Sequence, residues 1–379
     1  MSKIRSILEK LIYQDEYNII DRNMSDSNAG GRKNRNIRDN LFVLYAIINE
    51  AIRTGKSVDI QFYDISKCFD AMWNEETMND IYDVGIQDDK FSLISLINQK
   101  CKVKVKTPVG DTEPFELESI EMQGTVTAPL KCAVQMDTLA RDCYRTNSGL
   151  YMYRNSCTVP PLGFIDDIAG VAECGTDSVV LNGIVNAKIE SKKLQFNCKK
   201  CVNMHIGKRQ EQCHMNRVHE TKMEMTNKQI YLGDTISNTG CNEINIKERC
   251  KTGHAAISEI MSMLRDFSFG RFTIQTGLIF RDSIFTSKML LNSEVWHSLT
   301  KSQIEELEVI DRILLRNILN AHCKTSTEWL YSDCGKLDLK SRIIMRRLMY
   351  FWHILSRDKA ELIHRIYDAQ SINNNTGDW

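Results

Sequence analysis

Two adjacent carboxylates lie inside an otherwise apolar segment of this sequence. Residues 162–170 read LGFIDDIAG, so Asp166 and Asp167 are flanked on both sides by apolar or small side chains. Such a segment is typical of a buried strand or of the tip of a hairpin. Burial of one carboxylate is unfavourable, and a second one beside it adds like-charge repulsion. The pair is therefore either a solvated polar turn or part of a site that holds a strongly positive group.

A third carboxylate follows another strand signal. Residues 58–65, VDIQFYDI, alternate in polarity and are rich in strand-forming residues, with Asp64 near the C-terminal end. Paired strands lie about 4.8 Å apart, so the three carboxylates converge if these two strands pair. Carboxylate oxygens suit hard divalent cations, and two such ions about 3.5–4 Å apart promote in-line phosphoryl transfer. Their charge would also offset the repulsion between the acids.

Elements of both periods must position these acids. Helical spacing predicts helices over 6–21, 41–56, 91–100, 127–144 and 176–194, and a helix or turn over 67–73. Alternating patterns predict strands over 58–65, 201–207 and 229–237, and two short strands flanking the acids within 163–174. The segments 101–111 and 114–122 alternate like a hairpin pair around Pro108 and Gly110. From about Ile244 the pattern is nearly all helical, and Ile304, Leu307, Ile310, Leu314 and Ile318 form one stripe. Helices, then mixed elements, then helices only indicate an α+β fold.

Composition limits the class of protein but not its activity. The chain has 379 residues, of which 42% are hydrophobic and 26% charged, and its 49 basic and 49 acidic residues give no net charge. A neutral total is weak evidence against an overall basic coat, although it can hide a basic groove. No apolar run approaches the ~18 residues of a membrane span. The N-terminus has no signal-peptide pattern and there are thirteen cysteines, which predicts reduced thiols in the cytoplasm, the nucleus or both.

Several segments together resemble a known family. DISKCFD at 64–70, MQGTVTAP at 122–129 and FIDD at 164–167 resemble motifs A, B and C of reverse transcriptases, in the family's order. Three more resemble its non-LTR (LINE-type) retrotransposon branch: a fingers motif at 27–42, motif D at 194–204 and motif E at 231–237. The resemblance covers roughly residues 5–240, and the helical remainder is similar to the family's thumb.

The resemblance implies a fold, a domain plan and an activity. The fold would be a right-hand polymerase palm, an antiparallel sheet with flanking helices, with partial fingers over 1–56 and the palm over 57–240. A finger insertion would lie around 75–118, and a helical thumb with a C-terminal extension over 241–379. The activity would be RNA-directed DNA synthesis with two Mg²⁺ or Mn²⁺ ions, an RNA template, a DNA primer and dNTPs. We also expect a fragment of a longer retroelement polyprotein, lacking the first fingers motif, the endonuclease and any zinc knuckle.

Four catalytic residues are implied by position. Asp64, Asp166 and Asp167 would bind the metal ions, and Lys200 would donate a proton to pyrophosphate. Ile165 stands where the family usually has Ala, Val or Met, and it adds bulk beside the primer end. Without the resemblance, Lys200 is equally well explained as a surface lysine.

Substrate contacts are implied in the same way. Phe69 would be the steric gate that excludes a 2′-OH, beside Ile65, and Gln123 with Gly124 would lie along the nucleotide and template. The basic residues of the fingers motif would face nucleic-acid phosphate: Arg32, Lys33 and Arg35. The plainer interpretations are a core aromatic for Phe69 and a solvated loop for the basic run.

Three other interpretations stay open. The spacing of Cys198, Cys201, His205, Cys213, His214 and His219 admits a zinc site, although the first two bracket the motif D lysine. A catalytically inactive reverse-transcriptase remnant could act as an RNA- or protein-binding module. An RNA-templated RNA polymerase is a closer alternative, against which Phe69 argues because a bulky gate blocks ribonucleotides.

Overall fold

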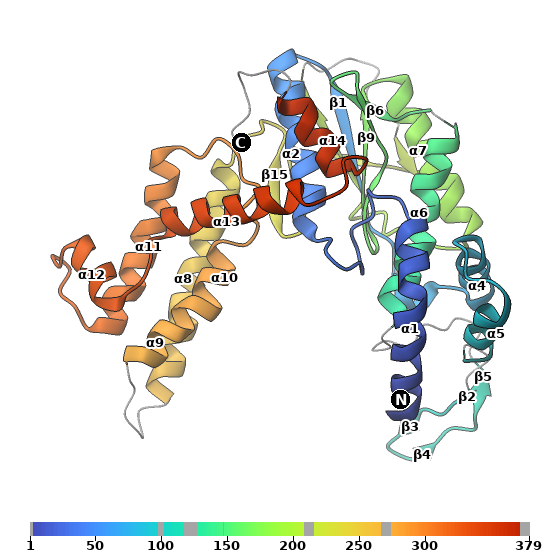
Figure 1. Ribbon diagram of the computed structural model, residues 1–379, viewed down its shortest axis with the longest axis horizontal. Helices are drawn as coiled ribbons and strands as arrows, with labels where there is room; N and C mark the ends of the chain where they lie inside the picture. The colour runs from blue at the N-terminus through green and yellow to red at the C-terminus, as the bar shows by residue number, and fades with distance from the viewer. Residues whose placement is uncertain are drawn as a thin grey trace. The chain divides into compact units, whose positions relative to one another are not determined.

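A computed structural model describes residues 3–97, 102–116, 127–146, 148–207, 216–266 and 274–371 (Figure 1). The chain divides into two units, Met1–Thr226 and Asn227–Trp379. The first unit mixes helices with a five-stranded sheet, and the second is helical apart from one hairpin. The predicted α+β class is therefore confirmed.

The sheet of the first unit has the strand order β13-β10-β1-β9-β8. Its members are β1 (Val58–Tyr63), β8 (Leu162–Phe164), β9 (Asp167–Glu173), β10 (Val202–Ile206) and β13 (Glu224–Met225). All neighbours pair antiparallel except β10 with β13. Tyr63 pairs with Ile168, so the strands expected to carry the acids are adjacent, as Figure 1 shows for β1 and β9.

Every residue of the central strand β1 is buried, because helices cover both faces of the sheet there. The helices of this unit are α1 (Lys3–Asn23), α2 (Ile37–Thr54), α3 (Cys68–Ala71), α4 (Asn74–Asp83), α5 (Asp88–Ile97), α6 (Ala128–Thr146) and α7 (Thr176–Ser191). Side chains of α6 and α7, such as Cys132 and Leu181, share a core cluster with Tyr63 of β1. Helix α2 begins with a capping box of Asn36 and Asp39 and ends at Gly55 in the left-handed conformation.

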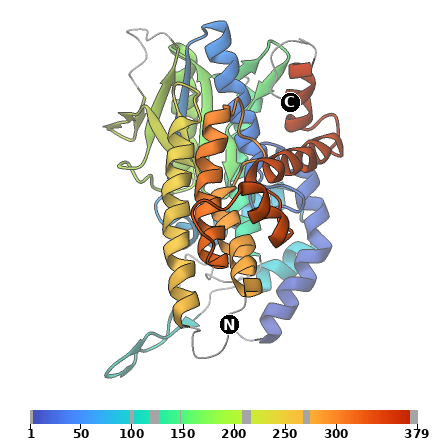
Figure 2. The same ribbon diagram turned by 90° about the vertical axis from the view of Figure 1, so that its left-hand side faces the viewer.

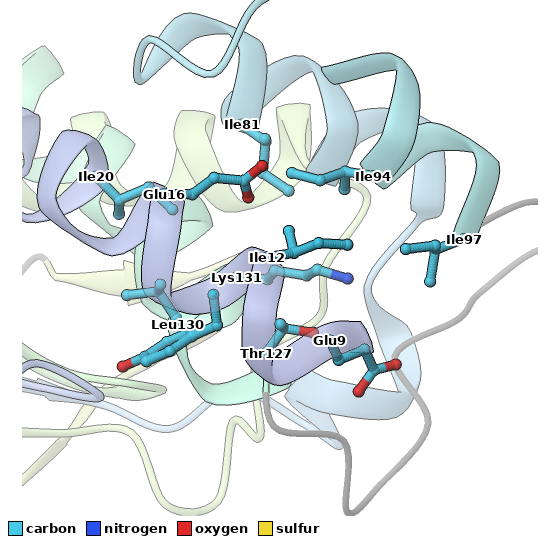
Figure 3. A pocket seen from close by; sticks show the side chains of 11 residues that line it. Glu9, Ile12, Glu16, Ile20, Ile81, Ile94, Ile97, Thr127, Leu130 and Lys131 are labelled. Atoms are coloured by element: carbon cyan, nitrogen blue, oxygen red, sulfur yellow. The ribbon is translucent and has the colours of Figure 1, made fainter. Parts of the chain in front are cut away.

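A second core cluster joins α1, α4, α5 and α6. Figure 3 shows isoleucines from three of these helices, including Ile12, Ile81 and Ile94, converging on one small cavity. The cavity has a volume of about 30 Å³, which is room for about one water molecule. This part of the unit is therefore packed by apolar burial and does not hold a ligand-sized pocket.

The first unit also contains short hairpins that are separate from the five-stranded sheet. They pair β2 (Lys102–Val103) with β5 (Phe115–Glu116), β3 (Lys106–Thr107) with β4 (Gly110–Asp111), β6 (Tyr151–Tyr153) with β7 (Cys157–Val159), and β11 (Arg217–Val218) with β12 (Thr221–Lys222). The first two pairs confirm the hairpin predicted around Pro108 and Gly110.

The second unit begins with a hairpin of β14 (Lys228–Tyr231) and β15 (Asp234–Ser237). Its helices are α8 (Glu243–Asp266), α9 (Ile274–Phe280), a π-helical turn (Arg281–Phe285), α10 (Thr286–Met289), α11 (Lys301–Leu319), α12 (Thr327–Cys334), α13 (Leu339–Leu355) and α14 (Leu362–Ser371). Figure 2 shows α8, in yellow, beside α11, in orange, and the two helices are in contact. Of the stripe predicted on α11, all members but Ile304 are buried.

Two buried aspartates, Asp234 and Asp311, link the elements of this unit through hydrogen bonds. Asp234 in the hairpin accepts hydrogen bonds from Arg249, Asn292 and Trp296. The Arg281 guanidinium donates two bonds to Asp311, at 2.7 Å and 2.5 Å, and both side chains are fully buried. The donors around both carboxylates offset the cost of burying them. The hairpin of β14 and β15 is thereby fixed to α8 within this unit.

Candidate active site

The adjacent acids lie at the tip of the β8–β9 hairpin. Phe164 pairs with Asp167, which leaves Ile165 and Asp166 as a two-residue turn. Ile165 has φ +61, a conformation in which a two-residue hairpin turn usually has glycine. A β-branched residue is strained there, at a cost on the order of 1–3 kcal/mol. The turn therefore keeps its shape only because the surrounding structure holds it.

A loop from the N-terminal part of the chain holds this hairpin. Asn28 forms a parallel bridge with Gly163, whose amide donates to Ser27 and whose carbonyl accepts from the Ala29 amide and the Asn40 side chain. Gly30 lies so close that a Cβ added to it would be 2.3 Å from the Ile165 nitrogen. Residues 27–30, here called the bracing loop, therefore support the turn that carries Asp166, a role that sequence reasoning missed.

The three carboxylates lie near one another at one edge of the sheet, but their oxygens do not all come within 4.8 Å of one another. The β1–β9 register places Asp64 next to Asp167, and Asp166 follows in the turn. Burial, and then the Asp64 carboxylate, raise the pKa of Asp166 above its ordinary value. Partial burial, Asp166 and Asp64 do the same for the pKa of Asp167. Three oxygen donors that repel one another are suited to binding a hard divalent cation.

The motif D segment is bonded to the backbone at Asp64. Ile65 forms an antiparallel bridge with Phe196, and the Asn197 amide donates to the Asp64 carbonyl at 2.9 Å. This brings the Lys200 ammonium within 3.5 Å of the Asp64 carboxylate, with 68% of the lysine side chain exposed. An ion pair so exposed adds little stability, so the lysine is free to serve another partner.

A cleft of about 930 Å³ opens at these residues. Its walls include Asp64, Asp166, Lys200 and Phe69, together with Trp73 and Lys193. Phe69 is half-buried on α3 and also packs against the core cluster of the sheet. Ile65 lines the cleft, but its side chain is 4% exposed, so it presents mainly backbone.

Trp73 and Lys193 were not predicted from sequence. The Lys193 ammonium lies 4.8 Å from the centroid of the Trp73 ring. Lys193 has φ +56, and it follows directly after Lys192, which pairs with Asp80 at 2.7 Å. The sequence around Lys193 does not distinguish this lysine from its neighbours. Only the tertiary fold brings it to the cleft.

The predicted phosphate contact of Arg32 does not agree with the position of its side chain. The Arg32 side chain is 1% exposed and pairs with Asp21 at 2.6 Å. It also donates to the carbonyls of Ser25, Asn28 and Asp21, so it holds the bracing loop together. Four of its five N–H groups donate within the fold and the side chain is buried, so it is a structural residue and is poorly placed to contact nucleic acid.

The two other basic residues of this motif differ from Arg32. Lys33 is exposed, with its ammonium 4.5 Å from the centroid of the Tyr17 ring. Arg35 is half-buried and donates to the Asp26 carbonyl at 3.1 Å. Lys33 is the better candidate for a phosphate contact.

Some predicted residues lie outside the described part of the chain. These are Gln123 and Gly124 of the motif B segment, and Cys213 and His214 of the zinc interpretation. The Cys201 thiol is buried against the Asp64 backbone, 3.4 Å from its nitrogen. Within the described ranges, neither Cys198 nor Cys201 belongs to a group of three potential metal ligands.

The raised pKa values give a stability prediction. A carboxyl whose pKa is raised on folding stabilises the fold at low pH, and this contribution is lost as pH rises through the raised pKa. In metal-free buffer at neutral pH, Asp166→Asn should therefore raise the melting temperature by about 1–2 °C, a small gain because solvent screens part of the repulsion at this half-exposed side chain. Thermal denaturation as a function of pH measures this, and the gain should vanish at acid pH. Asp111→Asn on the exposed β3–β4 hairpin is the control, and an equal gain there would contradict the prediction.

Residues 1–236 match the family model described as reverse transcriptase (RNA-dependent DNA polymerase). No curated protein matches the sequence.

Among solved structures, apo telomerase from Candida tropicalis aligns with 96% of this chain and 61% of its own, at 12% identity and a TM-score of 0.46. A telomerase from Candida albicans in complex with a TWJ fragment of telomeric RNA aligns over 78% and 51%, at 12% identity and a TM-score of 0.42. This chain thus spans about half to three fifths of those telomerase chains.

None of the described helices is both long enough and apolar enough to cross a membrane.

Proposed function

This chain belongs to the reverse transcriptase (RNA-dependent DNA polymerase) family, and from that premise we propose that it copies RNA into DNA by extending a primer with dNTPs. The observation that carries the proposal is the proximity of Asp64, Asp166 and Asp167 at the edge of the sheet, beside a cleft. The volume of the cleft, about 930 Å³, is large enough for a nucleotide. Neither feature is needed for a protein that only binds RNA.

Asp64, Asp166 and Asp167 would hold two Mg²⁺ or Mn²⁺ ions, since their donor chemistry and mutual repulsion suit hard cations. When bound, such ions activate the primer 3′-OH and stabilise the charge on the leaving pyrophosphate. Lys200 would place its ammonium where the leaving group gains charge, because it is exposed and within reach of Asp64. Lys33 would contact nucleic-acid phosphate from just after the bracing loop.

The domain plan and origin belong to the same proposal. Fingers would comprise residues 1–56, the palm 57–240 and the thumb 241–379, in an element of the non-LTR retrotransposon type. The polypeptide would work within a longer retroelement polyprotein. The alternative, an inactive remnant that binds RNA or protein, predicts intact binding without any synthesis.

Primer extension tests the activity. Purified protein is given a primed RNA template, Mg²⁺ or Mn²⁺, and either dNTPs or NTPs. Wild type should extend the primer with dNTPs, and Asp166→Asn should lose about 10³-fold or more, since metal binding contributes several kcal/mol of transition-state stabilisation.

Asp111→Asn is the matched control, because it removes one exposed carboxylate of the β3–β4 hairpin, outside the motif segments. Equal background signal from wild type and Asp166→Asn would exclude the enzyme in favour of the remnant. Extension with NTPs alone would indicate the RNA polymerase instead.

A further inference from the structure

A second group of ligand-type side chains lies at the opposite end of the central strands. Within the described residues, Asp59, Cys174 and His205 each place one potential ligand atom within 4.8 Å of the other two. Asp59 is at the start of β1, whereas Asp64 follows its end, so roughly 16 Å of strand separates them. The group is therefore separate from the three carboxylates of the cleft.

Strand register explains why these three residues meet. Asp59 pairs directly with His205 on β10 and with Ala172 on β9, and directly paired residues share a face of the sheet. Cys174 is two residues beyond Ala172, and its amide donates to the Ser57 carbonyl at 3.0 Å, which continues the ladder. By the two-residue period, Cys174 lies on that same face.

One carboxylate oxygen of Asp59 lacks a hydrogen-bond partner among the described residues. Its side chain is fully buried, and Oδ1 lies 2.8 Å from His205 Nδ1. The other oxygen, Oδ2, is buried with no hydrogen-bond partner among the described residues. A buried carboxylate oxygen without a partner is costly, so this position favours a bound cation.

From this arrangement we propose that Asp59, Cys174 and His205 form a zinc-binding site. Carboxylate, thiolate and imidazole are the ligand types of Zn²⁺, and the thiolate disfavours Mg²⁺. Ligand atoms around a tetrahedral zinc ion lie roughly 3.3–3.8 Å apart, as its bond lengths require. Here Asp59 Oδ1 and His205 Nδ1 lie 2.8 Å apart, and the three ligand atoms lie within 4.8 Å of one another. Side-chain rotation can therefore bring all three to zinc-binding distance.

The site depends on the redox state of the chain. Among the described residues ten cysteines are free, but Cys174 is disulfide-bonded, and a disulfide sulfur cannot act as a thiolate ligand. A dithiol reductant converts this disulfide to two thiols and is itself oxidised to a disulfide. The Cys174 thiol then releases its proton to solvent as sulfur binds zinc, and neutral His205 donates a ring nitrogen.

The bound ion would link β10 and β1 to the end of β9, and these three neighbouring strands position the motif A, C and D residues. Its role is structural, and it holds whether or not the chain polymerises nucleotides. Removal of zinc should therefore lower the melting temperature of the reduced chain.

Metal titration of the full chain tests the site. The protein is reduced with dithiothreitol, transferred to metal-free buffer without oxygen, and titrated with Co²⁺ and then with Zn²⁺ against a chelator. We expect a thiolate-to-cobalt charge-transfer band that zinc abolishes at one equivalent. Cys174→Ser should lose the band and bind zinc more than about 10-fold more weakly, the least effect expected even for outer partners of a metal ligand.

Matched variants separate this site from others. Cys198→Ser removes a half-buried thiol outside the group and should keep the band. Asp166→Asn should also keep it, so failure of the catalytic proposal leaves this result unaffected. Asp59→Asn and His205→Gln provide a second test if Cys174→Ser folds poorly, as judged by circular dichroism. No cobalt–thiolate band in the reduced wild type, or unchanged zinc affinity in Asp59→Asn and His205→Gln, would overturn the site.

Discussion

Replacement of Gly30 by alanine should lower primer extension by about 100-fold and destabilise the first unit. The added Cβ would lie 2.3 Å from the Ile165 nitrogen and 2.9 Å from the Phe164 carbonyl carbon. These are backbone atoms, so no side-chain rotation can relieve the clash. Displacement of the turn moves Asp166, and an error of about 1 Å in a catalytic group costs on the order of 10²-fold in rate.

The effect of this substitution is steric and not conformational. Gly30 does not have a positive φ, so alanine can adopt its backbone conformation. Overpacking of this kind usually costs about 1–3 kcal/mol of stability. Both steady-state primer extension and thermal denaturation should therefore register the change, and a variant with full activity would show that the loop does not brace the turn.

Gly183 in α7 gives a matched control. A Cβ at that position meets nothing within 4 Å, and the residue is exposed within the helix. Alanine is favoured over glycine in a helix by about 1 kcal/mol. Gly183→Ala should accordingly keep full activity with equal or higher stability, although it makes the same chemical change.

Replacement of Phe69 by valine should raise the efficiency of NTP incorporation relative to dNTP by about 10- to 200-fold. Phe69 lines the cleft from α3, five residues after Asp64, where a sugar would lie above it. A smaller side chain makes room for a 2′-hydroxyl, and changes of pocket size on this scale alter discrimination by about 1–3 kcal/mol. Single-nucleotide extension with matched dNTP and NTP pairs measures the ratio.

Two controls separate a gate from a packing role, since Phe69 also touches the core cluster. Phe69→Tyr keeps the ring and should keep the discrimination. Met136→Val removes volume from the same cluster away from the cleft and should reduce stability alone. If Phe69→Val lowers activity with both nucleotides equally, its ring supports the fold and does not select the sugar.

Sequence alone predicted the order of elements and the proximity of the acids. The alternating segment at 58–65 and the apolar arms around Asp166 specify two strands, because period two leaves one buried arrangement for each. Once those strands are paired, Asp64 must lie beside Asp167. The hairpin, the helices from 176 and the helical C-terminal part were also predicted from periodicity.

The division of the chain was less predictable. Motif E lies within the stretch assigned by sequence to the palm, yet its hairpin belongs to the second unit, which begins at Asn227. The reason is the buried Asp234, whose partners Arg249, Asn292 and Trp296 all follow later in the chain. Strand patterns do not reveal which distant side chains satisfy a buried charge.

What the sequence determined by itself is therefore the local chemistry: which residues form strands, and which carboxylates terminate them. The tertiary structure alone decided how basic residues are used, because the same run contains buried Arg32 and exposed Lys33. It alone brought Gly30 against Ile165, Lys193 to the cleft, and Asp59, Cys174 and His205 to one face of the sheet. These contacts join segments far apart in the chain, and short-range periodicity contains no information on long-range packing.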